Sequence, residues 1–301
     1  MSHIIALIFD FDITLSPAFQ QQVLFDAWGV DANNFWAECD ALAARGYDLE
    51  HAYLRNLIDY GRRDAKYALT NEALYEMGKH VALYDGLSRK NGQRAIFDDI
   101  QALIHSEAYA QHNITLECYC ISGGLKPMIQ GAFEAHGLTE FFKEIFACEI
   151  DEDHTENPVK LGYIKETVGH TIKTQKLFMI GKGISPQRGD PPAMVNEVFE
   201  EYRIPFTQML FMGDGQTDIP AFSLINRAGG TSIAVYREEK NADGSIDEAR
   251  TLKTYQKGYE LAIQSGRAEQ LLPADYSAGK PLKMALLGYV ERLAGMMADG
   301  M

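Results

Sequence analysis

Five short apolar runs mark the chain, and each has the length of a β-strand. They cover residues 4–9, 116–121, 145–150, 209–212 and 231–236. The first run is entirely apolar and rich in β-branched residues, as expected for a strand buried on both faces of a parallel sheet. Apolar positions at helical spacing fill most of the later intervals, as in 127–136 and 218–225. This alternation predicts an α/β fold, a doubly wound parallel sheet joined by right-handed crossovers.

The interval between the first and second predicted strands has a different pattern. It spans about a hundred residues and is mainly helical in spacing. The helical stretches are 19–28, 34–45, 49–60 and 71–81. Because a structureless loop of this length is implausible in a compact domain, we expect an inserted helical domain. The predicted division is a core made of residues 1–15 and 114–301 and a helical cap made of residues 16–113.

Three later segments differ from the strand and helix rhythm. Residues 184–207 contain four prolines, which predicts an extra loop with a short helix. Residues 238–248 are polar and are expected at the surface. Residues 280–297 carry apolar side chains at helical spacing, which predicts a closing amphipathic helix that packs on the core.

Composition and charge exclude several classes of protein. The chain has 301 residues, of which 46% are hydrophobic, and this argues against a disordered chain. The formal net charge is −14. Non-specific nucleic-acid binding needs a basic face, and docking on anionic lipid needs the same, so neither nucleic acid nor membrane is an expected partner.

The cysteines and the apolar segments bear on the cellular compartment. The four cysteines have no zinc-site spacing, and Cys118 and Cys120 fall in a predicted strand, so buried and reduced thiols are expected. No stretch approaches the ~20 apolar residues of a membrane span. The first apolar run is too short for a signal peptide. These features predict a cytoplasmic protein.

Polar side chains follow three of the predicted strands at the point where each strand ends. They are Asp10 and Asp12 after the first strand, Ser122 and Gly123 after the second, and Asp214 and Asp218 after the fourth. In an open α/β sheet, ligands bind outside the carboxyl ends of the strands. We therefore expect the three clusters to meet in one crevice.

The residue types in these clusters suit phosphate chemistry. A carboxylate can attack phosphorus and form an acyl phosphate, and a second acid can protonate the leaving oxygen and then activate water. Crowded carboxylates such as Asp10, Asp12 and Asp214 need a cation, and Mg²⁺ prefers oxygen ligands and binds substrate phosphate. The hydroxyl of Ser122 and backbone N–H groups near Gly123 can donate hydrogen bonds to phosphate.

The clusters resemble the motifs of the haloacid dehalogenase superfamily. Its first motif, a strand followed by Asp-x-Asp-x-Thr, is matched by Asp10, Asp12 and Thr14. Its second, a strand followed by Ser or Thr, is matched by Ser122, and its fourth, Gly-Asp-x-x-x-Asp, is matched by residues 213–218. The inserted helical cap is similar to that of the phosphoserine phosphatase-like branch. The resemblance implies a Rossmann-like core with the five predicted strands in the order three-two-one-four-five.

The resemblance also implies a role for each matched residue. Asp10 would be the nucleophile, and Asp12 would be the general acid and base and would lend its backbone carbonyl to Mg²⁺. Asp214 would complete the metal site with Asp10. Asp218 would belong to the same site by orienting Asp214 or a water. The matched residues expected to brace the turn or hold phosphate are Thr14, Ser122 and Gly123.

The third motif of the family is a lone lysine before the fourth strand. Lys173 lies near the start of a predicted helix, where the family places its lysine, and is followed by an apolar run at 177–180. Lys182 lies between two glycines, nearer a helix end, and is the alternative. We favour Lys173 as the residue that offsets negative charge during the reaction.

The activity that the resemblance implies is magnesium-dependent hydrolysis of a small phosphomonoester through an aspartyl-phosphate intermediate. A sugar-phosphate mutase uses the same two acids, Asp10 and Asp12, and remains an alternative. A second alternative is a regulatory or binding protein that has the same fold but has lost catalytic activity. A carbon–halogen hydrolase is not expected, because dehalogenases of the family lack an acid at the position of Asp12.

The predicted cap has its own expected role. It begins just after Thr14 and ends just before the strand that carries Ser122, so both junctions would lie over the crevice. We expect it to close over a small phosphorylated metabolite and exclude bulk water. The cap residues considered for binding an anionic group of that substrate are Arg45, Arg55, Arg62 and Arg63.

Overall fold

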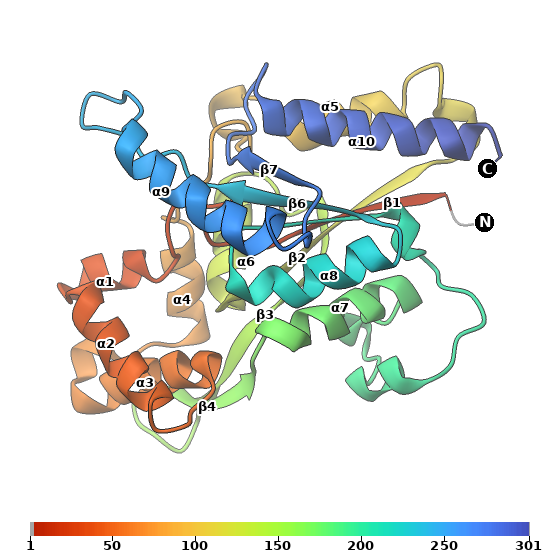
Figure 1. The fold of residues 1–301 in the computed structure, drawn as a ribbon. Coiled ribbons are helices and arrows are strands. Elements are labelled where there is room, and N and C mark those ends of the chain that lie inside the picture. The colour runs from red at the N-terminus through yellow and green to blue at the C-terminus, as the bar shows by residue number, and fades with distance from the viewer. Residues whose placement is uncertain (1–2, 301) are drawn as a thin grey trace.

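The computed structural model describes residues 3–300 and contains a seven-stranded sheet with helices on both faces (Figure 1). The strands are β1 (Ile4–Phe9), β2 (Thr115–Leu125), β3 (Phe142–Asp153), β4 (Lys160–Glu166), β5 (Met209–Gly213), β6 (Thr231–Tyr236) and β7 (Gln270–Pro273). They lie in the order β4-β3-β2-β1-β5-β6-β7. Adjacent strands are parallel, except that β3 and β4 are antiparallel.

The sheet confirms the predicted fold class and strand order. The five predicted strands correspond to β1, β2, β3, β5 and β6, and their order across the sheet is three-two-one-four-five. The two strands that the sequence analysis missed, β4 and β7, lie at the two edges of the sheet. Edge strands are half exposed, so β4 carries charged residues and β7 is only four residues long. Neither shows the continuous apolar run of a central strand.

Helices flank the sheet on both faces and extend beyond one end of it. They are α1 (Gln22–Trp28), α2 (Ala32–Ala43), α3 (Leu49–Arg63), α4 (Asn71–Gly78), α5 (Ile96–Ile104), α6 (Lys126–Ala135), α7 (His170–Lys182), α8 (Ile219–Arg227), α9 (Glu248–Gly258) and α10 (Pro281–Ala298). In Figure 1, α5 and α10 cover one face of the sheet, and α7 and α8 cover the other. None of the helices within residues 3–300 is both long enough and apolar enough to cross a membrane.

The centre of the core is β1, whose residues 5–9 have no exposed surface. The ring of Phe9 packs edge-on against Phe97 of α5 and Phe142 of β3, with centroid separations of 5.8 and 6.1 Å. Burying large apolar and aromatic side chains is the main favourable contribution to folding. The rings of Phe97 and Phe142 also contact each other, so the last residue before the first acidic cluster is fixed by one aromatic cluster.

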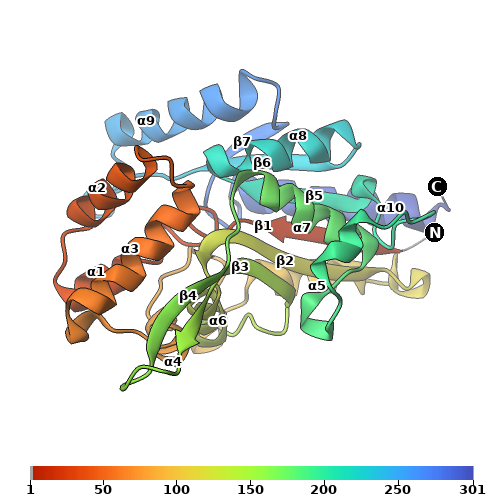
Figure 2. The same ribbon diagram turned by 90° about the horizontal axis from the view of Figure 1, so that it is seen from below.

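The inserted segment divides into parts that pack in different places. Helices α1–α3 gather beyond the end of the sheet, at the left in both views (Figures 1 and 2). Helix α4 instead packs on α6 of the core, where two glycines bring the backbones together. A Cβ on Gly78 would lie 2.2 Å from the carbonyl oxygen of Met128, and one on Gly131 would lie 2.0 Å from that of Tyr75. Helix α5 packs against α10 and β2.

Backbone hydrogen bonds mark where the inserted segment returns to the sheet. The N–H of Tyr84 donates to the carbonyl of Leu15 at 3.0 Å, and the N–H of Ile96 donates to the carbonyl of Gly86 at 2.8 Å. The chain is thus beside the turn that follows β1 again well before residue 113. The division at 16–113 remains a prediction, and this packing favours a shorter cap.

The later segments follow their predicted patterns. Residues 184–207 form a loop with short 3₁₀ turns, at Pro186–Arg188 and Pro192–Asn196 among others. The closing helix is α10, whose apolar stripe is buried against the core. All four cysteines are buried.

The 184–207 loop is fastened to the sheet by an ion cluster around Glu117 of β2. Arg203 Nη1 donates to Glu117 Oε2 at 2.7 Å, the Tyr119 hydroxyl donates to the same oxygen, and Lys143 pairs with the carboxylate from β3. Burial opposes ionisation of Glu117, but these hydrogen bonds outweigh it and lower its pKa to about 2. The depressed pKa makes the cluster stabilising at neutral pH.

We predict that Glu117→Gln lowers the free energy of unfolding by about 1–3 kcal/mol at pH 7, because Arg203 loses its charged partner. A carboxyl with a depressed folded-state pKa stabilises above its unfolded pKa of about 4.3 and loses that effect as the pH falls toward the folded value. Urea denaturation between pH 7 and 3 should show the difference from the parent chain shrinking below pH 4.5. The control is Glu72→Gln, exposed on α4. A difference that stays constant over this range would contradict the assignment.

Candidate active site

The carboxyl end of β1 delivers Asp10 into the space below the α1–α3 helices. Asp10 is 6% exposed, and its N–H donates to Met212 of β5 at 2.8 Å, which extends the β1–β5 pairing by one step. Its Oδ1 accepts the N–H of Phe11 at 2.7 Å. These two backbone contacts fix where the carboxylate points, so one oxygen is held by the chain and the other is directed toward the neighbouring strands.

The chain turns sharply after Asp10, and this turn positions the second acid. Ile13 has a φ of +60°, a left-handed conformation that is rare for a β-branched residue and typical of functional sites. The N–H groups of Leu15 and Ser16 both donate to the carbonyl of Phe11, which closes the turn. Thr14 is fully buried, and its hydroxyl has no hydrogen-bond partner among the described residues.

Asp12 is held by the first residues of the inserted segment. Its Oδ1 accepts the N–H of Gln20 at 2.8 Å. The side chain of Gln20 is buried and accepts the N–H of Leu125, at the end of β2, through Oε1 at 3.1 Å. Gln20 therefore ties the acid after β1 to the end of the next strand. The sequence analysis missed it, because a glutamine before a helix gives no signal of such a contact.

The second cluster forms the wall opposite Asp12. Ser122 is 1% exposed, and its Oγ accepts the N–H of Gly124 at 3.0 Å. A Cβ on Gly124 would lie 1.8 Å from Nε2 of Gln20, so only glycine leaves room for that side chain. The carbonyl of Gly123 accepts the hydroxyl of Tyr53, on α3, at 2.7 Å. The end of β2 is thus in direct contact with the helices above it.

The third cluster folds back on itself around Asp218. Its Oδ2 accepts the N–H groups of Asp214 and Gly215, at 3.2 and 3.1 Å. A Cβ on Gly213 would lie 2.4 Å from the carboxylate carbon of Asp218, which explains the glycine before the first acid of this motif. Asp218 precedes α8 but does not cap it with its side chain. Its carboxylate instead fixes the backbone that carries Asp214.

Lys173 connects the first and third clusters. It lies in the first turn of α7 and has no exposed surface. Its ammonium lies 3.0 Å from Asp10 Oδ2 and 2.7 Å from Asp218 Oδ1. Lys182, at the other end of the helix, donates instead to the carbonyls of Val195 and Glu197 in the 184–207 loop. The geometry brings Lys173 into the acidic cluster and leaves Lys182 outside it.

The electrostatics follow from burial and crowding. Burial raises the pKa of Asp10 to about 6 against the opposing attraction of Lys173. Burial, and then the charge of Asp10, raise the pKa of Asp12 to about 7. Burial, Asp218 and Asp10 all raise the pKa of Asp214. Burial disfavours the charge of Lys173, but the carboxylates of Asp10 and Asp218 outweigh it and raise its pKa. The clustered carboxylates bring more negative charge to the site than Lys173 offsets.

This excess fits a divalent cation. Carboxylate oxygens of Asp10, Asp214 and Asp218 all lie within 4.8 Å of one another. Asp218 is the most occupied of the three, because its oxygens accept Lys173 and two backbone N–H groups. Each oxygen of Asp10 has one such contact and keeps a lone pair for a metal, so Asp10 and Asp214 are the better direct ligands. Oxygen ligands of this kind suit Mg²⁺. Asp12 can add its backbone carbonyl but is not part of the carboxylate cluster.

A cavity of about 410 Å³ opens onto these groups. The core residues on its wall are Asp10, Asp12, Ser122, Gly123, Asp214, Gly215, Gln216, Thr217 and Lys257. The residues of the inserted segment on its wall are Phe19, Gln21, Trp36, Cys39, Asp40, Leu49, Glu50, Ala52 and Tyr53. The strand ends and the helices above them therefore enclose one space, as predicted for the crevice.

The cap arginines considered as substrate ligands are not part of this wall, and that prediction is wrong. Arg55 and Arg62 pair with Asp59 on the same helix, and Arg63 pairs with Glu38 of α2. The guanidinium of Arg45 lies over the ring of Tyr47. All four side chains are used outside the cavity. The cap side of the cavity wall is instead formed by acidic and aromatic residues that the sequence analysis did not select.

The comparisons with known proteins give mostly distant relatives. No protein-family model matches the chain. A protein from Borreliella burgdorferi, described as an uncharacterized protein, is 29% identical over 288 residues, which cover 86% of this chain and 94% of that protein.

Several solved structures are similar at low sequence identity. A HAD family hydrolase from Salmonella enterica serovar Typhi is 16% identical with a TM-score of 0.49, and the match covers 78% of this chain and 62% of that one. A phospho-aspartyl intermediate analogue of phosphoserine phosphatase is 15% identical with a TM-score of 0.47 over 94% and 97% of the two chains. A cytosolic 5′-nucleotidase IIIB bound to cytidine is 13% identical with a TM-score of 0.47 over 98% and 88%.

These three structures are named a HAD family hydrolase, a phosphoserine phosphatase and a 5′-nucleotidase. The fold itself is the doubly wound α/β sheet described above. At identities of 13–16%, the function of this chain has to be argued from the geometry of its own site.

We predict that Mg²⁺ binds this site and that Asp214→Asn weakens binding about tenfold or more, because a direct ligand loses its charge. The same change should make the metal-free protein more stable, since it relieves repulsion among buried carboxylates. Titration calorimetry measures the affinity, and thermal unfolding with and without Mg²⁺ measures the stability. The control is Asp26→Asn, exposed on α1. Equal Mg²⁺ affinity for the Asp214 variant and the parent chain would refute the site.

Proposed function

We propose that the protein is a magnesium-dependent phosphatase of the haloacid dehalogenase type that hydrolyses a small phosphomonoester through an aspartyl-phosphate on Asp10. One observation carries the proposal. Asp10 lies at the end of the central strand, 3.0 Å from the ammonium of Lys173, and shares one cavity wall with Asp12, Ser122 and Asp214. This set contains a nucleophile, an acid, a phosphate ligand and a cation site.

The first step is transfer of the phosphoryl group to Asp10. A carboxylate oxygen of Asp10 attacks phosphorus as the bond to the ester oxygen breaks. Asp12 gives its proton to that departing oxygen, and its raised pKa of about 7 lets it hold the proton at neutral pH. The Ser122 hydroxyl and the N–H groups of the β2 end bind the phosphate oxygens.

The second step releases phosphate. Asp12, now a carboxylate, takes a proton from water, which attacks phosphorus and breaks its bond to Asp10. Lys173 stays charged between Asp10 and Asp218 and offsets the negative charge that develops on the phosphoryl oxygens. When bound, Mg²⁺ neutralises phosphate charge and orients the reacting group.

The helices α1–α3 are proposed to be the lid of this site. The segment that carries them is fastened to the core at both ends. Arg237 donates to the carbonyl of Pro17 at 2.9 Å. At the other end, the N–H of Leu161, in β4, donates to the carbonyl of Leu69 at 2.8 Å. Opening of the lid would break the hydrogen bond between Tyr53 and Gly123, while the two ends of the segment would stay attached to the core. We therefore propose a moving cap of about residues 17–69 in place of 16–113.

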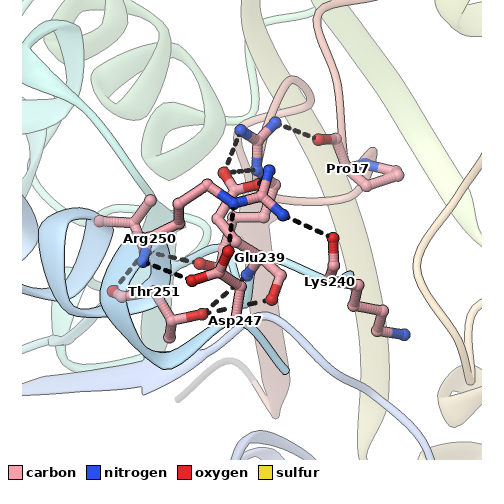
Figure 3. Close-up of polar contacts among 8 residues, drawn as sticks. Pro17, Glu239, Lys240, Asp247, Arg250 and Thr251 are labelled. Atoms are coloured by element: carbon pink, nitrogen blue, oxygen red, sulfur yellow. Dashed lines mark hydrogen bonds and ion pairs between the residues drawn. The ribbon is translucent and has the colours of Figure 1, made fainter. Parts of the chain in front are cut away.

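The entry of this cap is braced by a cluster after β6. Glu239 lies near the carbonyl of Pro17 and accepts Arg237, and Arg250 lies between Glu239 and Asp247 (Figure 3). The cluster is formed by the loop before α9 and by α9 itself. It therefore links the start of the cap to the helix that also places Lys257 on the cavity wall.

Two other functions remain candidates. A sugar-phosphate mutase would use Asp10 and Asp12 in the same way, and it would yield an isomerised sugar phosphate in place of free phosphate. A retired binding protein would bind Mg²⁺ and a phosphorylated ligand without turnover. Product analysis of a metabolite panel with Mg²⁺ separates the three.

We predict that Asp10→Asn lowers phosphatase activity by about a thousandfold or more while leaving the fold intact, because the amide is a poor nucleophile. Activity is measured with a generic phosphate monoester in the presence of Mg²⁺, and folding by circular dichroism. Asp26→Asn is the matched control. Near-normal turnover by the Asp10 variant would exclude the aspartyl-phosphate mechanism.

We further predict that Lys173→Met lowers the rate about a hundredfold or more and that Lys182→Met does not, since only Lys173 contacts the carboxylates of the site. Removing a buried ammonium also leaves two carboxylates unpaired, so rates are normalised to the folded fraction. If the Lys182 variant alone is inactive, the lysine has been assigned incorrectly.

A further inference from the structure

The cap side and the core side of the cavity differ in chemistry. The core side carries the groups proposed to bind phosphate. The cap side carries two carboxylates, Asp40 and Glu50, and three aromatic rings, Phe19, Trp36 and Tyr53. Among the described residues on the cavity wall, Lys257 is the one lysine or arginine, and it belongs to α9 of the core. The cap side thus presents no cation to a substrate.

Glu50 is the central group of this surface. It lies in the first turn of α3 and is 6% exposed. Its carboxylate reaches the core, since a Cβ on Gly169 would lie 2.2 Å from its Cδ and one on Gly123 would lie 4.0 Å from its Oε1. Within residues 3–300, no lysine or arginine pairs with this carboxylate; burial raises its pKa, and a hydrogen bond with the Asp48 side chain raises it further. A buried carboxylate without a cationic partner is costly to ionise unless a ligand supplies that cation.

The rings extend the same surface. The centroid of Trp36 lies 6.0 Å from that of Phe19 and 6.1 Å from that of Tyr53, so the three rings form a row along the cavity. Aromatic faces attract cations, and ammonium groups are bound in proteins by rings of this kind. Carboxylates beside the rings add full charge. The cap side therefore has the composition of an ammonium-binding surface.

The position of Glu50 sets the length of the ligand. Gly123 follows Ser122, the proposed phosphate ligand, so the carboxylate of Glu50 lies close to the phosphate position. Two like charges there would repel unless a positive group lies between them. A cationic nitrogen only a few atoms from the phosphate meets this need. A nucleotide, whose base lies far from its phosphate, does not.

We infer that the substrate is the phosphate monoester of a small amino alcohol, whose ammonium nitrogen binds Glu50, Asp40 and the row of aromatic rings. The inference rests on the proposed phosphatase function. An ester whose leaving group carries a carboxylate is disfavoured, because it would meet Asp40 and Glu50 without a compensating cap arginine.

The test compares esters matched in size but not in charge. Phosphocholine is paired with 3,3-dimethylbutyl phosphate, in which a neutral tert-butyl group replaces the trimethylammonium group. Phosphoethanolamine, phosphoserine and a nucleoside monophosphate complete the set. With Mg²⁺ present, kcat/KM for phosphocholine or phosphoethanolamine should exceed that for the uncharged isostere by about tenfold or more. Glu50→Gln and Trp36→Leu should each lower this ratio severalfold. Glu72→Gln, an exposed control on α4 outside the cavity wall, should leave it unchanged.

Calorimetric titration measures the affinity for each of these ligands, so it shows the binding preference even for an ester that is not hydrolysed. Equal rates and affinities for the cationic ester and its isostere, or preference for phosphoserine or the nucleotide, would overturn the inference while phosphatase activity stands. A ratio that Glu50→Gln leaves intact in a folded variant would also overturn it. Tighter binding of the cationic ester without hydrolysis of any ester would support the ammonium site and overturn the proposed function alone.

Discussion

The site depends on one buried ammonium. Lys173 has no exposed surface and lies within 3.0 Å of both Asp10 and Asp218, so it joins the end of β1, the first turn of α7 and the loop before α8. An unpaired charge at this depth would cost several kcal/mol, and its partners would be equally costly without it. Because Asp218 also holds the backbone of Asp214, the same ammonium indirectly positions a proposed metal ligand. The acids act as one network.

The sequence predicted what depends on strand ends and on burial along the chain. The apolar runs predicted the central strands, and the resemblance to the family implied their order across the sheet. Polar residues directly after those strands had to meet at one edge of the sheet. Contacts between distant helices carry no such signal. Choosing between Lys173 and Lys182 needed the start of α7, and β4 and β7 escaped because edge strands are short or charged.

The cap shows most clearly which contacts the sequence does not predict. Arginines of the inserted segment were plausible ligands by charge, yet each contacts a carboxylate or a tyrosine ring of the same segment outside the cavity. Glu50 and Tyr53 reach the core from α3 because of how that helix lies against β2 and β4, a tertiary arrangement. The cavity is therefore composed of two chemically distinct halves, and the sequence motifs describe only the half that belongs to the sheet.

The hydrogen bond between Tyr84 and Leu15 has a consequence for how such a protein can change. The inserted segment leaves and rejoins the sheet at neighbouring points, so its length and helix content do not alter the spacing of the strands beneath it. Substitutions in α2 and α3 can reshape the entrance of the cavity without disturbing the buried ammonium. The residues at the strand ends and the residues of α2 and α3 on the cavity wall can therefore change independently during evolution. Proteins that keep the first set can differ in the second, and so in the ligand that the cavity binds.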